Sequence, residues 1–347
     1  DAAHSEEAGF LGKIDVQAIP ELCARCHSNP EFTVTYNPRL GVDQYEKYLT
    51  SRHGELLGMG LRKVATCTSC HTSHNVRPAS DPRSSTYAIN LPRTCAECHS
   101  DKEYMAGFPI PTDQFEKFAV SVHGQALLDR EDLGAPACND CHGNHGAVPP
   151  GAQSLAHVCG TCHALNMELF EKSPHVEPFE LQELPQCTVC HNHHAIPPPT
   201  PQTFNMGADS VCIKCHKQND PGWREGKAMY QKVTELQDMQ DEAETLLDQA
   251  QTLGMNVSDG RFLMRDFRSS FFQMRTLSHE FDLEAYMAKA EEAEKQLQGA
   301  IEVAEGAVDE FHYRREGLMV SVVLAMPVLL LLYLKIRSLD RRGKARG

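Results

Sequence analysis

The chain has 347 residues, a formal net charge of −14 and 41% hydrophobic residues. This length predicts two or three domains, and the composition excludes disordered and collagen-like classes. The negative charge argues against a nucleic-acid partner, because phosphate binding needs a basic surface. The first residues show no basic and apolar leader, which leaves open a chain that is not exported or one whose leader has been removed.

All 14 cysteines belong to C-x-x-C pairs, and each pair is followed at once by a histidine. Two thiols three positions apart lie on one face of a helical turn, where both can add to the vinyl groups of one haem and the next histidine can ligate the iron. Zinc sites and disulfides do not require a histidine after each pair. The pattern predicts seven covalently attached haem c groups. The attachment cysteines are Cys23, Cys26, Cys67, Cys70, Cys95, Cys98, Cys138, Cys141, Cys159, Cys162, Cys187, Cys190, Cys212 and Cys215, and the proximal ligands are His27, His71, His99, His142, His163, His191 and His216.

Each iron needs a second axial ligand, and the remaining histidines supply candidates in two settings. Some stand three residues after a proximal histidine, and others lie in Ser-x-His segments. A histidine of the first kind is tethered too closely to reach the far face of the same haem, so we expect it to ligate a neighbouring haem. The predicted distal ligands are His53, His74, His123, His145, His175, His194 and His279. His279 is preferred over His312 for the seventh position. His157 is interpreted as packed or hydrogen-bonded near a haem, and His193 as a neighbour of the ligand His194.

These motifs form an internal repeat of C-x-x-C-H, Ser-x-His, C-x-x-C-H-x-x-H and a Pro-rich tail. The repeat begins at Cys23, Cys95 and Cys159, and Cys212 opens a fourth module without a second haem. The segment is rich in Pro, Gly and short polar runs, which predicts loops and short helices. We expect the haems to act as its hydrophobic core, so that it does not fold without them.

With these motifs, residues 23–216 resemble the multihaem c-type cytochromes, in particular the cytochrome c3-like and nitrite-reductase-related superfamily. The resemblance implies haem attachment outside the cytoplasm, which favours a leader that has been removed. Membrane-anchored heptahaem cytochromes of this type often partner a membrane-integral quinone-reactive subunit. The chain departs from the tetrahaem quinol-dehydrogenase cytochromes, whose single helix precedes the haems, so their quinol-site residues are not carried over.

The composition changes after Pro221-Gly222, and residues 223–316 contain no Pro and no Cys. Apolar residues at helical spacing predict one helix before a turn at 254–260, a second from about 261 to 280, and a third from near Asp282. Residues 317–334 are uncharged and long enough for one membrane crossing. The basic segment 335–347 then places the C-terminus in the cytoplasm.

The expected fold class is therefore mostly α and irregular: a haem-packed domain, long C-terminal helices and one transmembrane helix. The expected domains are a heptahaem domain at 1–222, a helical region at 223–316, the transmembrane helix at 317–334, and a basic cytoplasmic tail at 335–347. This arrangement predicts a single-pass protein of the cytoplasmic membrane whose haem domain faces the periplasm or exterior.

The predicted function is electron transfer, because irons with two histidine ligands have no open position for a substrate. No catalytic residue is expected. The expected partners are a membrane-integral quinone-reactive subunit, other redox subunits, a soluble periplasmic electron carrier and the lipid bilayer. The alternative is a reductase or dehydrogenase for nitrite, hydroxylamine or a sulfur oxyanion, with one open-coordination haem. No C-x-x-C-K motif supports that alternative, and the membrane segment argues against a third possibility, a free filament of haem modules.

Overall fold

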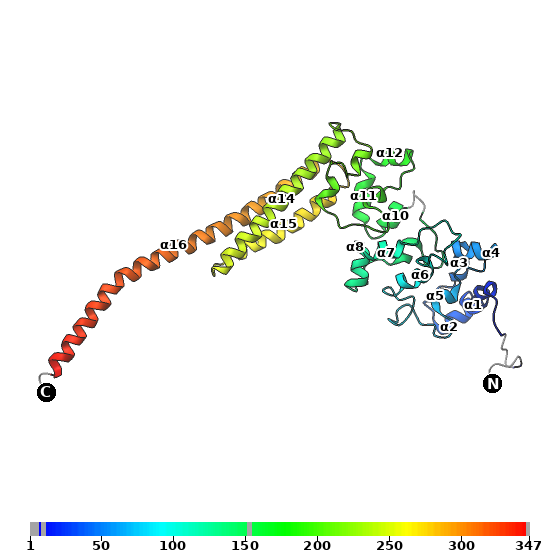
Figure 1. Ribbon diagram of the computed structural model, residues 1–347, viewed down its shortest axis with the longest axis horizontal. Helices are drawn as coiled ribbons and strands as arrows, with labels where there is room; N and C mark the ends of the chain where they lie inside the picture. The colour runs from blue at the N-terminus through cyan, green and yellow to red at the C-terminus, as the bar shows by residue number, and fades with distance from the viewer. Residues whose placement is uncertain (1–6, 8–11, 151–154, 345–347) are drawn as a thin grey trace. The chain divides into compact units, whose positions relative to one another are not determined.

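The computed structural model describes residue 7 and residues 12–150 and 155–344. These residues are mostly helical, contain no strand and end in one long apolar helix (Figure 1). They form two compact units. Unit 1 comprises Asp1–Glu168 and Pro174–Thr200, and unit 2 comprises Leu169–Ser173 and Pro201–Gly347. The first six C-x-x-C-H motifs therefore lie in unit 1, and the seventh lies in unit 2.

Short helices separated by loops make up the chain between residues 16 and 214, as the Pro-rich and Gly-rich sequence predicts. They are η3 (Val16–Ala18), α1 (Ile19–His27), α2 (Pro30–Tyr36), α3 (Gln44–Thr50), α4 (Arg52–Gly58), α5 (Cys67–His71), α6 (Leu91–His99), α7 (Gln114–Ala119), α8 (Val122–Gly124), the π-helix η4 (Gln125–Asp129), α9 (Cys138–His142), α10 (Leu155–Gly160), α11 (Ala164–Glu171), α12 (Val176–Leu181), α13 (Cys187–His191), η6 (Pro201–Phe204) and η7 (Cys212–Lys214).

Among the residues of unit 1 that the structure describes, the apolar core is small. One buried cluster there consists of Tyr48, Leu57 and Val64, with Val16 and Leu56 packed against it. A cluster of this size buries far less apolar surface than a domain of this length normally needs for stability. The six C-x-x-C-H motifs are distributed through the same unit.

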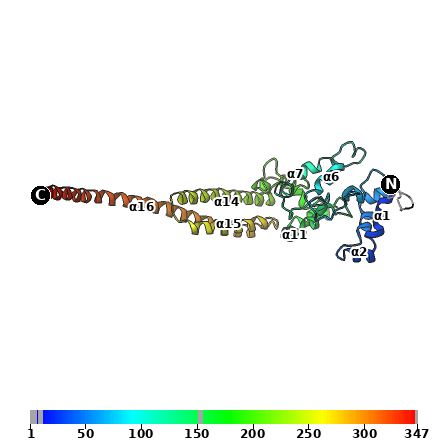
Figure 2. The same cartoon turned by 90° about the horizontal axis from the view of Figure 1, so that it is seen from below.

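Unit 2 contains three long helices, α14 (Pro221–Thr252), α15 (Ser258–Leu277) and α16 (Leu283–Lys344). The Asp220 carboxylate caps α14 by accepting a hydrogen bond of 2.7 Å from the backbone N–H of Trp223. Asp282 caps α16 in the same way, accepting from the N–H of Ala285 at 3.0 Å, as the sequence predicts. Figures 1 and 2 show α14 and α15 lying along the first half of α16.

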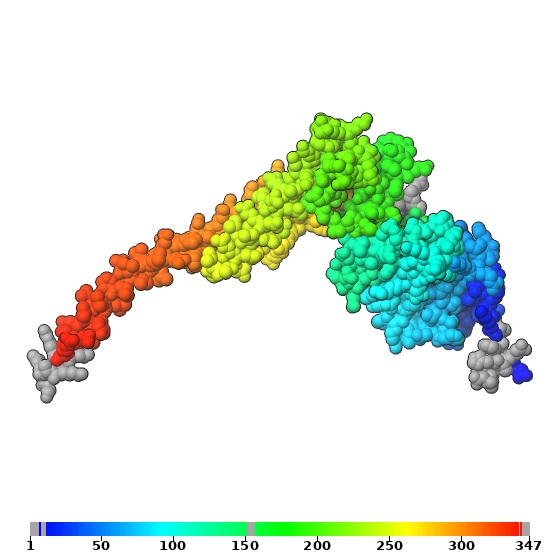
Figure 3. Space-filling view, viewed as in Figure 1, coloured from blue at the N-terminus to red at the C-terminus, as the bar shows by residue number. Residues whose placement is uncertain are grey.

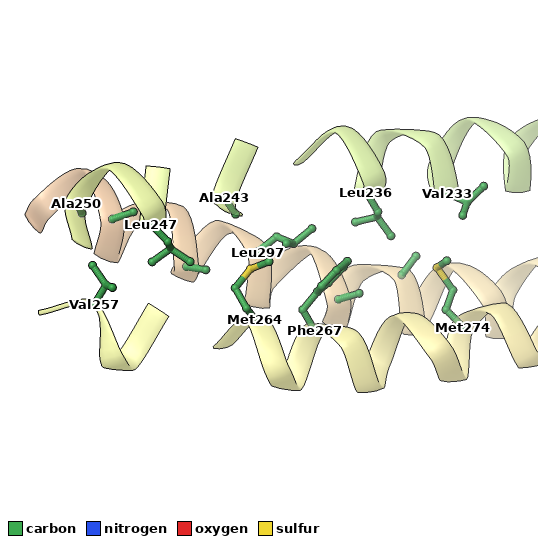
Figure 4. Close-up of a cluster of buried hydrophobic side chains, with 14 of the residues drawn as sticks. Val233, Leu236, Ala243, Leu247, Ala250, Val257, Met264, Phe267, Met274 and Leu297 are labelled. Carbon is green, nitrogen blue, oxygen red and sulfur yellow. The ribbon is translucent and has the colours of Figure 1, made fainter. Parts of the chain in front are cut away.

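The core of this bundle joins large side chains on α14 and α15 to small ones on α16 (Figure 4). Leu236 and Leu247 of α14 and Phe267 of α15 are fully buried. The buried positions of α16 are mostly alanines at alternating three- and four-residue spacing, so the other helices can approach it closely. They are Tyr286, Ala290, Ala293, Leu297, Ala300, Ala304 and Ala307.

The second half of α16 leaves the bundle without a break, so the third helix expected in region 223–316 and the expected transmembrane helix are one continuous helix of 62 residues. Pro327 lies inside the helix and does not end it. An 18-residue window there has a mean hydropathy of 2.5 and none of it is buried. Figure 3 shows this part of the helix uncovered by other chain segments. In length and composition α16 can cross a membrane.

Candidate cofactor-binding site

The three motifs of the C-x-x-C-H-x-x-H type share one backbone geometry. Their helices α5, α9 and α13 are only five residues long and end at the proximal histidine. The next residue has a positive φ in each case: 63° at Thr72, 79° at Gly143 and 66° at Asn192. A left-handed residue cannot continue a helix, so it turns the following histidine away from its own motif. At Thr72, a β-branched residue, this conformation is strained by about 1–3 kcal/mol.

In the described part of unit 1, histidines face each other in pairs across nearly equal gaps. Each pair joins a proximal histidine to a predicted distal one from another part of the chain. The ring centroids are 6.0 Å apart for His53 and His99, 6.1 Å for His71 and His145, 6.1 Å for His123 and His163, and 5.9 Å for His142 and His194. Two of the three histidines that follow their own proximal residue by three positions, His145 and His194, therefore face the proximal histidines of other motifs.

The width of these gaps fits a metal ion between the two rings. A metal–nitrogen bond is about 2 Å long, and the centre of an imidazole ring lies about 1 Å behind its bonded nitrogen. Two rings on opposite sides of one ion are then separated by about 6 Å. Among the described residues no group of three or more His, Cys, Asp or Glu side chains is arranged to hold a metal ion. Each of these gaps is therefore bounded by two imidazoles, which is the number of axial ligands that a haem iron can take.

The environment of these imidazoles favours their neutral form, which is the form that binds metals. Burial, followed by the charge of the facing ring, lowers the pKa of His53 and of His123. Burial is also the first cause of the lowered pKa of His145, where His71 and Lys47 act in the same direction and Asp43 opposes them. The pKa of His194 is lowered to about 4, again mainly by burial and then by the neighbouring His193.

Two Ser-x-His-Gly segments place their histidines with the same local structure. Ser51 accepts a hydrogen bond from the N–H of Gly54 at 2.9 Å and donates one to the carbonyl of Tyr48 at 2.6 Å. A Cβ at Gly54 would lie 2.0 Å from that carbonyl oxygen, so only glycine fits. Ser121, Gly124 and Phe118 repeat this arrangement around His123, with a Cβ position 1.9 Å from the Phe118 oxygen.

A backbone hydrogen bond ties each of these segments to a C-x-x-C-H-x-x-H motif further along the chain. The N–H of Arg52, just before His53, donates to the carbonyl of Ala147 at 3.0 Å. The N–H of Val122, just before His123, donates to the carbonyl of Ile196 at 3.0 Å. The segments holding His53 and His145, and those holding His123 and His194, are thereby fixed to each other in the same way.

The thiols of the six motifs in unit 1 are arranged in chain order. Within each module the first cysteines of the two motifs hydrogen bond, which raises the pKa of Cys95 against Cys138 and of Cys187 against Cys159. In the first module burial, and then Cys23, raises the pKa of Cys67 to about 12.

Between modules the second cysteine of one motif approaches the next motif. Burial and then the charge of Cys95 raise the pKa of Cys70 to about 11. Burial and then Cys159 raise that of Cys141. The motifs therefore neighbour one another in the order in which they occur from Cys23 to His191.

His27 and His74 are exposed, and within the described ranges no second imidazole faces either of them. His175 packs edge-on against Phe179 at 5.7 Å. His279 lies in the turn after α15, with its Nδ1 3.0 Å from the carbonyl of Thr276.

His312 lies on α16 and is exposed, and its ring contacts Phe311 at 5.6 Å. His157 is also exposed. His193 is exposed and lies edge-on to His194 at 4.8 Å, so its ring packs beside a predicted ligand.

The seventh motif has its own surroundings in unit 2. Nδ1 of His216 lies 3.5 Å from the Asp220 carboxylate, which can orient the ring as carboxylates do for metal-bound histidines. A Cβ at Gly222 would lie 2.3 Å from Cε1 of His216, so glycine lets the first turn of α14 pack on the ring. A cavity of about 510 Å³ adjoins it, lined by Met206, Gly207, Ala208, Ile213, His216, Lys217, Gln218 and Trp223.

Sequence reasoning did not identify which histidines face each other, the left-handed turns, or Asp220. The Asp220 signal was present in the sequence as a carboxylate four residues after a proximal histidine. No family model, curated protein or solved structure matches this chain.

Proposed function

We propose that the chain is a membrane-anchored heptahaem c-type cytochrome that relays electrons. The observation that carries the proposal is the set of four imidazole pairs separated by 5.9–6.1 Å, each formed by the histidine of a C-x-x-C-H motif and a distant histidine. When bound, haem supplies a one-electron iron couple. The residues of the chain would attach it, ligate it on both faces and hold neighbouring groups close together.

The thiol order supports a continuous row of such groups through unit 1. First cysteines that hydrogen bond within a module would hold two porphyrin edges close together. The proximal histidines of a module are also near each other, since His27 acts electrostatically on His71 and His142 acts on His99. An electron could then pass from motif to motif in chain order. The scarcity of apolar core in unit 1 fits a domain that is filled by its cofactors.

The apolar half of α16 supports membrane attachment. Its 11 Leu and Val residues between positions 317 and 334 each favour insertion by about 0.3–0.6 kcal/mol, in total about 3–7 kcal/mol. The basic residues after it favour a cytoplasmic C-terminus, which would leave unit 1 and the three-helix bundle of unit 2 on the periplasmic or outer face. A single helix offers little surface for a quinone pocket, so we infer a membrane-integral quinone-reactive partner within a respiratory complex. Other redox subunits or a soluble carrier would accept or donate the electrons.

The decisive experiment uses the full chain produced in cells that attach haem c. The denatured polypeptide should carry seven haems by mass and by the pyridine haemochrome assay. His145→Ala should convert one low-spin haem to a high-spin one that binds carbon monoxide, because it removes the ring facing His71. His157→Ala is the matched control, since His157 is exposed. A chain without bound haem, or a His145→Ala spectrum identical to that of the control, would refute the proposal.

The quinone link needs its own test. The chain should be isolated from its native membrane in mild detergent, and a polytopic subunit should co-elute with it. Quinol added to that complex should reduce the haems, whereas quinol added to the isolated chain should not. Reduction of the isolated chain at the same rate would contradict the inferred partner.

One observation favours a second candidate, a multihaem reductase or dehydrogenase. His27 is exposed and faces no imidazole among the described residues, so the first motif is where an open coordination position would lie. In that case the unmodified chain would itself contain high-spin haem and bind carbon monoxide. A wholly low-spin chain would exclude this candidate.

A further inference from the structure

The seventh proximal histidine, His216, is followed by a tight turn that returns the chain to its ring. Asn219 has a left-handed backbone with a φ of 70°, a conformation that asparagine adopts more readily than most residues. The N–H of Asp220 donates to the carbonyl of Lys217 at 3.1 Å and closes the turn. This turn brings the side chain of Asp220 to the ring of His216, four positions earlier in the chain.

The Asp220 carboxylate is held in place by three groups of the chain. Its Oδ1 accepts the N–H of Trp223 at 2.7 Å, and its Oδ2 accepts the N–H of Lys217 at 2.8 Å. Oδ1 also lies 3.5 Å from Nδ1 of His216. The side chains of His216 and Asp220 are only 31% and 32% exposed, so salt screens this contact less than one on the open surface.

A glycine in the first turn of α14 lets the ring pack closely beside the carboxylate. A Cβ at Gly222 would lie 2.3 Å from Cε1 and 2.5 Å from Nδ1 of His216, so a larger residue would displace the ring. The ring therefore packs on the helix whose N-cap is Asp220. His216 also lines the cavity of about 510 Å³, which offers space for a cofactor at the same ring.

We propose that Asp220 is a positioning residue that accepts the Nδ1–H of His216 and lowers the reduction potential of the seventh haem. The inference rests on the proposed function, in which His216 ligates an iron. A histidine that binds a metal through one ring nitrogen carries an N–H on the other, and this N–H is nearly always donated to a carboxylate, a carbonyl or water. A carboxylate acceptor makes the imidazole a stronger donor to the iron and favours the ferric state.

The fourth motif shows the uncharged counterpart of this arrangement. Nδ1 of His142 lies 3.3 Å from the backbone carbonyl of Val148. A hydrogen bond to an ionised acceptor is roughly twice as strong as one between neutral groups, so the carbonyl polarises its imidazole less than a carboxylate does. Replacing Asp220 by asparagine would therefore give His216 a neutral acceptor of the kind that His142 already has.

The test is a spectroscopic redox titration of the full haem-loaded chain carrying Asp220→Asn. Asparagine keeps an N-cap oxygen for α14 and removes the negative charge. One one-electron component should shift to higher potential by about tenfold in its equilibrium constant, which is 59 mV for one electron. Glu225→Gln is the matched control, because it removes the same charge from an exposed position near the start of α14 and should leave every component in place.

A second variant and an assignment make the test independent of one substitution. Asp220→Ser also keeps an N-cap oxygen without the charge, so it should raise the same component. That component should be the one missing from a chain that lacks the seventh haem, made by combining Cys212→Ala and Cys215→Ala. A shift in a component that this chain retains would contradict the inference.

The results separate this inference from the proposed function. If the chain carries seven haems but both Asp220 variants titrate like the wild type, or if Glu225→Gln shifts as far as they do, the positioning role is wrong and the cytochrome proposal stands. If the wild-type chain carries no haem, both are wrong. Asp220 variants that only lose thermal stability, with unchanged potentials, assign the aspartate to helix capping alone and overturn the inference.

Discussion

Replacing Gly54 by alanine should disrupt the segment that holds His53. The added Cβ would lie 2.0 Å from the Tyr48 carbonyl oxygen, whereas ordinary contacts begin at 3.4 Å, so one of the two groups must move by 1.4 Å. The oxygen cannot move alone, because it accepts hydrogen bonds from Oγ and N–H of Ser51. Overpacking costs about 1–3 kcal/mol and each lost hydrogen bond about 0.5–1.5 kcal/mol.

The expected loss is about 2–4 kcal/mol, which in a unit of this size lowers Tm by on the order of 10 °C. Thermal unfolding of the full chain in detergent, followed by far-ultraviolet circular dichroism, measures this shift. Gly58→Ala is the matched control in the same helix, since nothing lies within 4 Å of its Cβ position. The reasoning fails if the Tm of Gly54→Ala equals that of the wild type, or if the Tm of Gly58→Ala is lowered as much as that of Gly54→Ala.

Three further predictions concern unit 2. Burial raises the pKa of Tyr286 above its ordinary 10.0, so above pH 10 the unfolded chain releases this proton first and bundle stability falls as pH rises. In urea titrations at pH 9 to 11, the free energy of unfolding of Tyr286→Phe should fall less steeply with pH than that of the wild type. Equal slopes would contradict the prediction. Ala300→Leu should lower the free energy of unfolding by about 1–3 kcal/mol because Ala300 is fully buried, whereas Ala288→Leu at an exposed position of the same helix should leave the urea midpoint unchanged. Leu324→Arg costs about 2.5–3.5 kcal/mol of insertion energy, so much of this variant should appear in the supernatant of an alkaline carbonate extraction. The control variant Leu324→Ile should stay in the membrane pellet. Identical partition of the two variants would count against a membrane crossing.

The sequence predicted the helical parts of the fold well where local signals decide them. The second helix was expected from about 261 to 280 and is observed at Ser258–Leu277, and the third was expected from Asp282 and begins at Leu283. The continuity of α16 was not predicted, because the change from a charged to an uncharged surface at residue 317 marks a change of surroundings and not a helix end. The unit boundary at Thr200 likewise depends on contacts between distant segments.

The candidate ligands could be named from sequence, but their pairing could not. His145 faces His71 because Gly143 turns the chain and because Arg52 hydrogen bonds to Ala147. Neither the turn nor a contact between residues so far apart leaves a readable pattern in one sequence. The spacing of three residues showed only that His145 could not serve its own motif.

In the proposed membrane-anchored state, the unbroken path of α16 would set a clearance between the bundle and the bilayer. Ala307 is the last buried residue of the bundle, and the uncharged run begins at Gly317. Ten residues of helix correspond to about 15 Å, and no glycine-proline hinge interrupts them. A neighbouring subunit that extends beyond the lipid headgroups could therefore reach beneath the three-helix bundle. The continuous helix would hold the bundle at a constant distance from the bilayer.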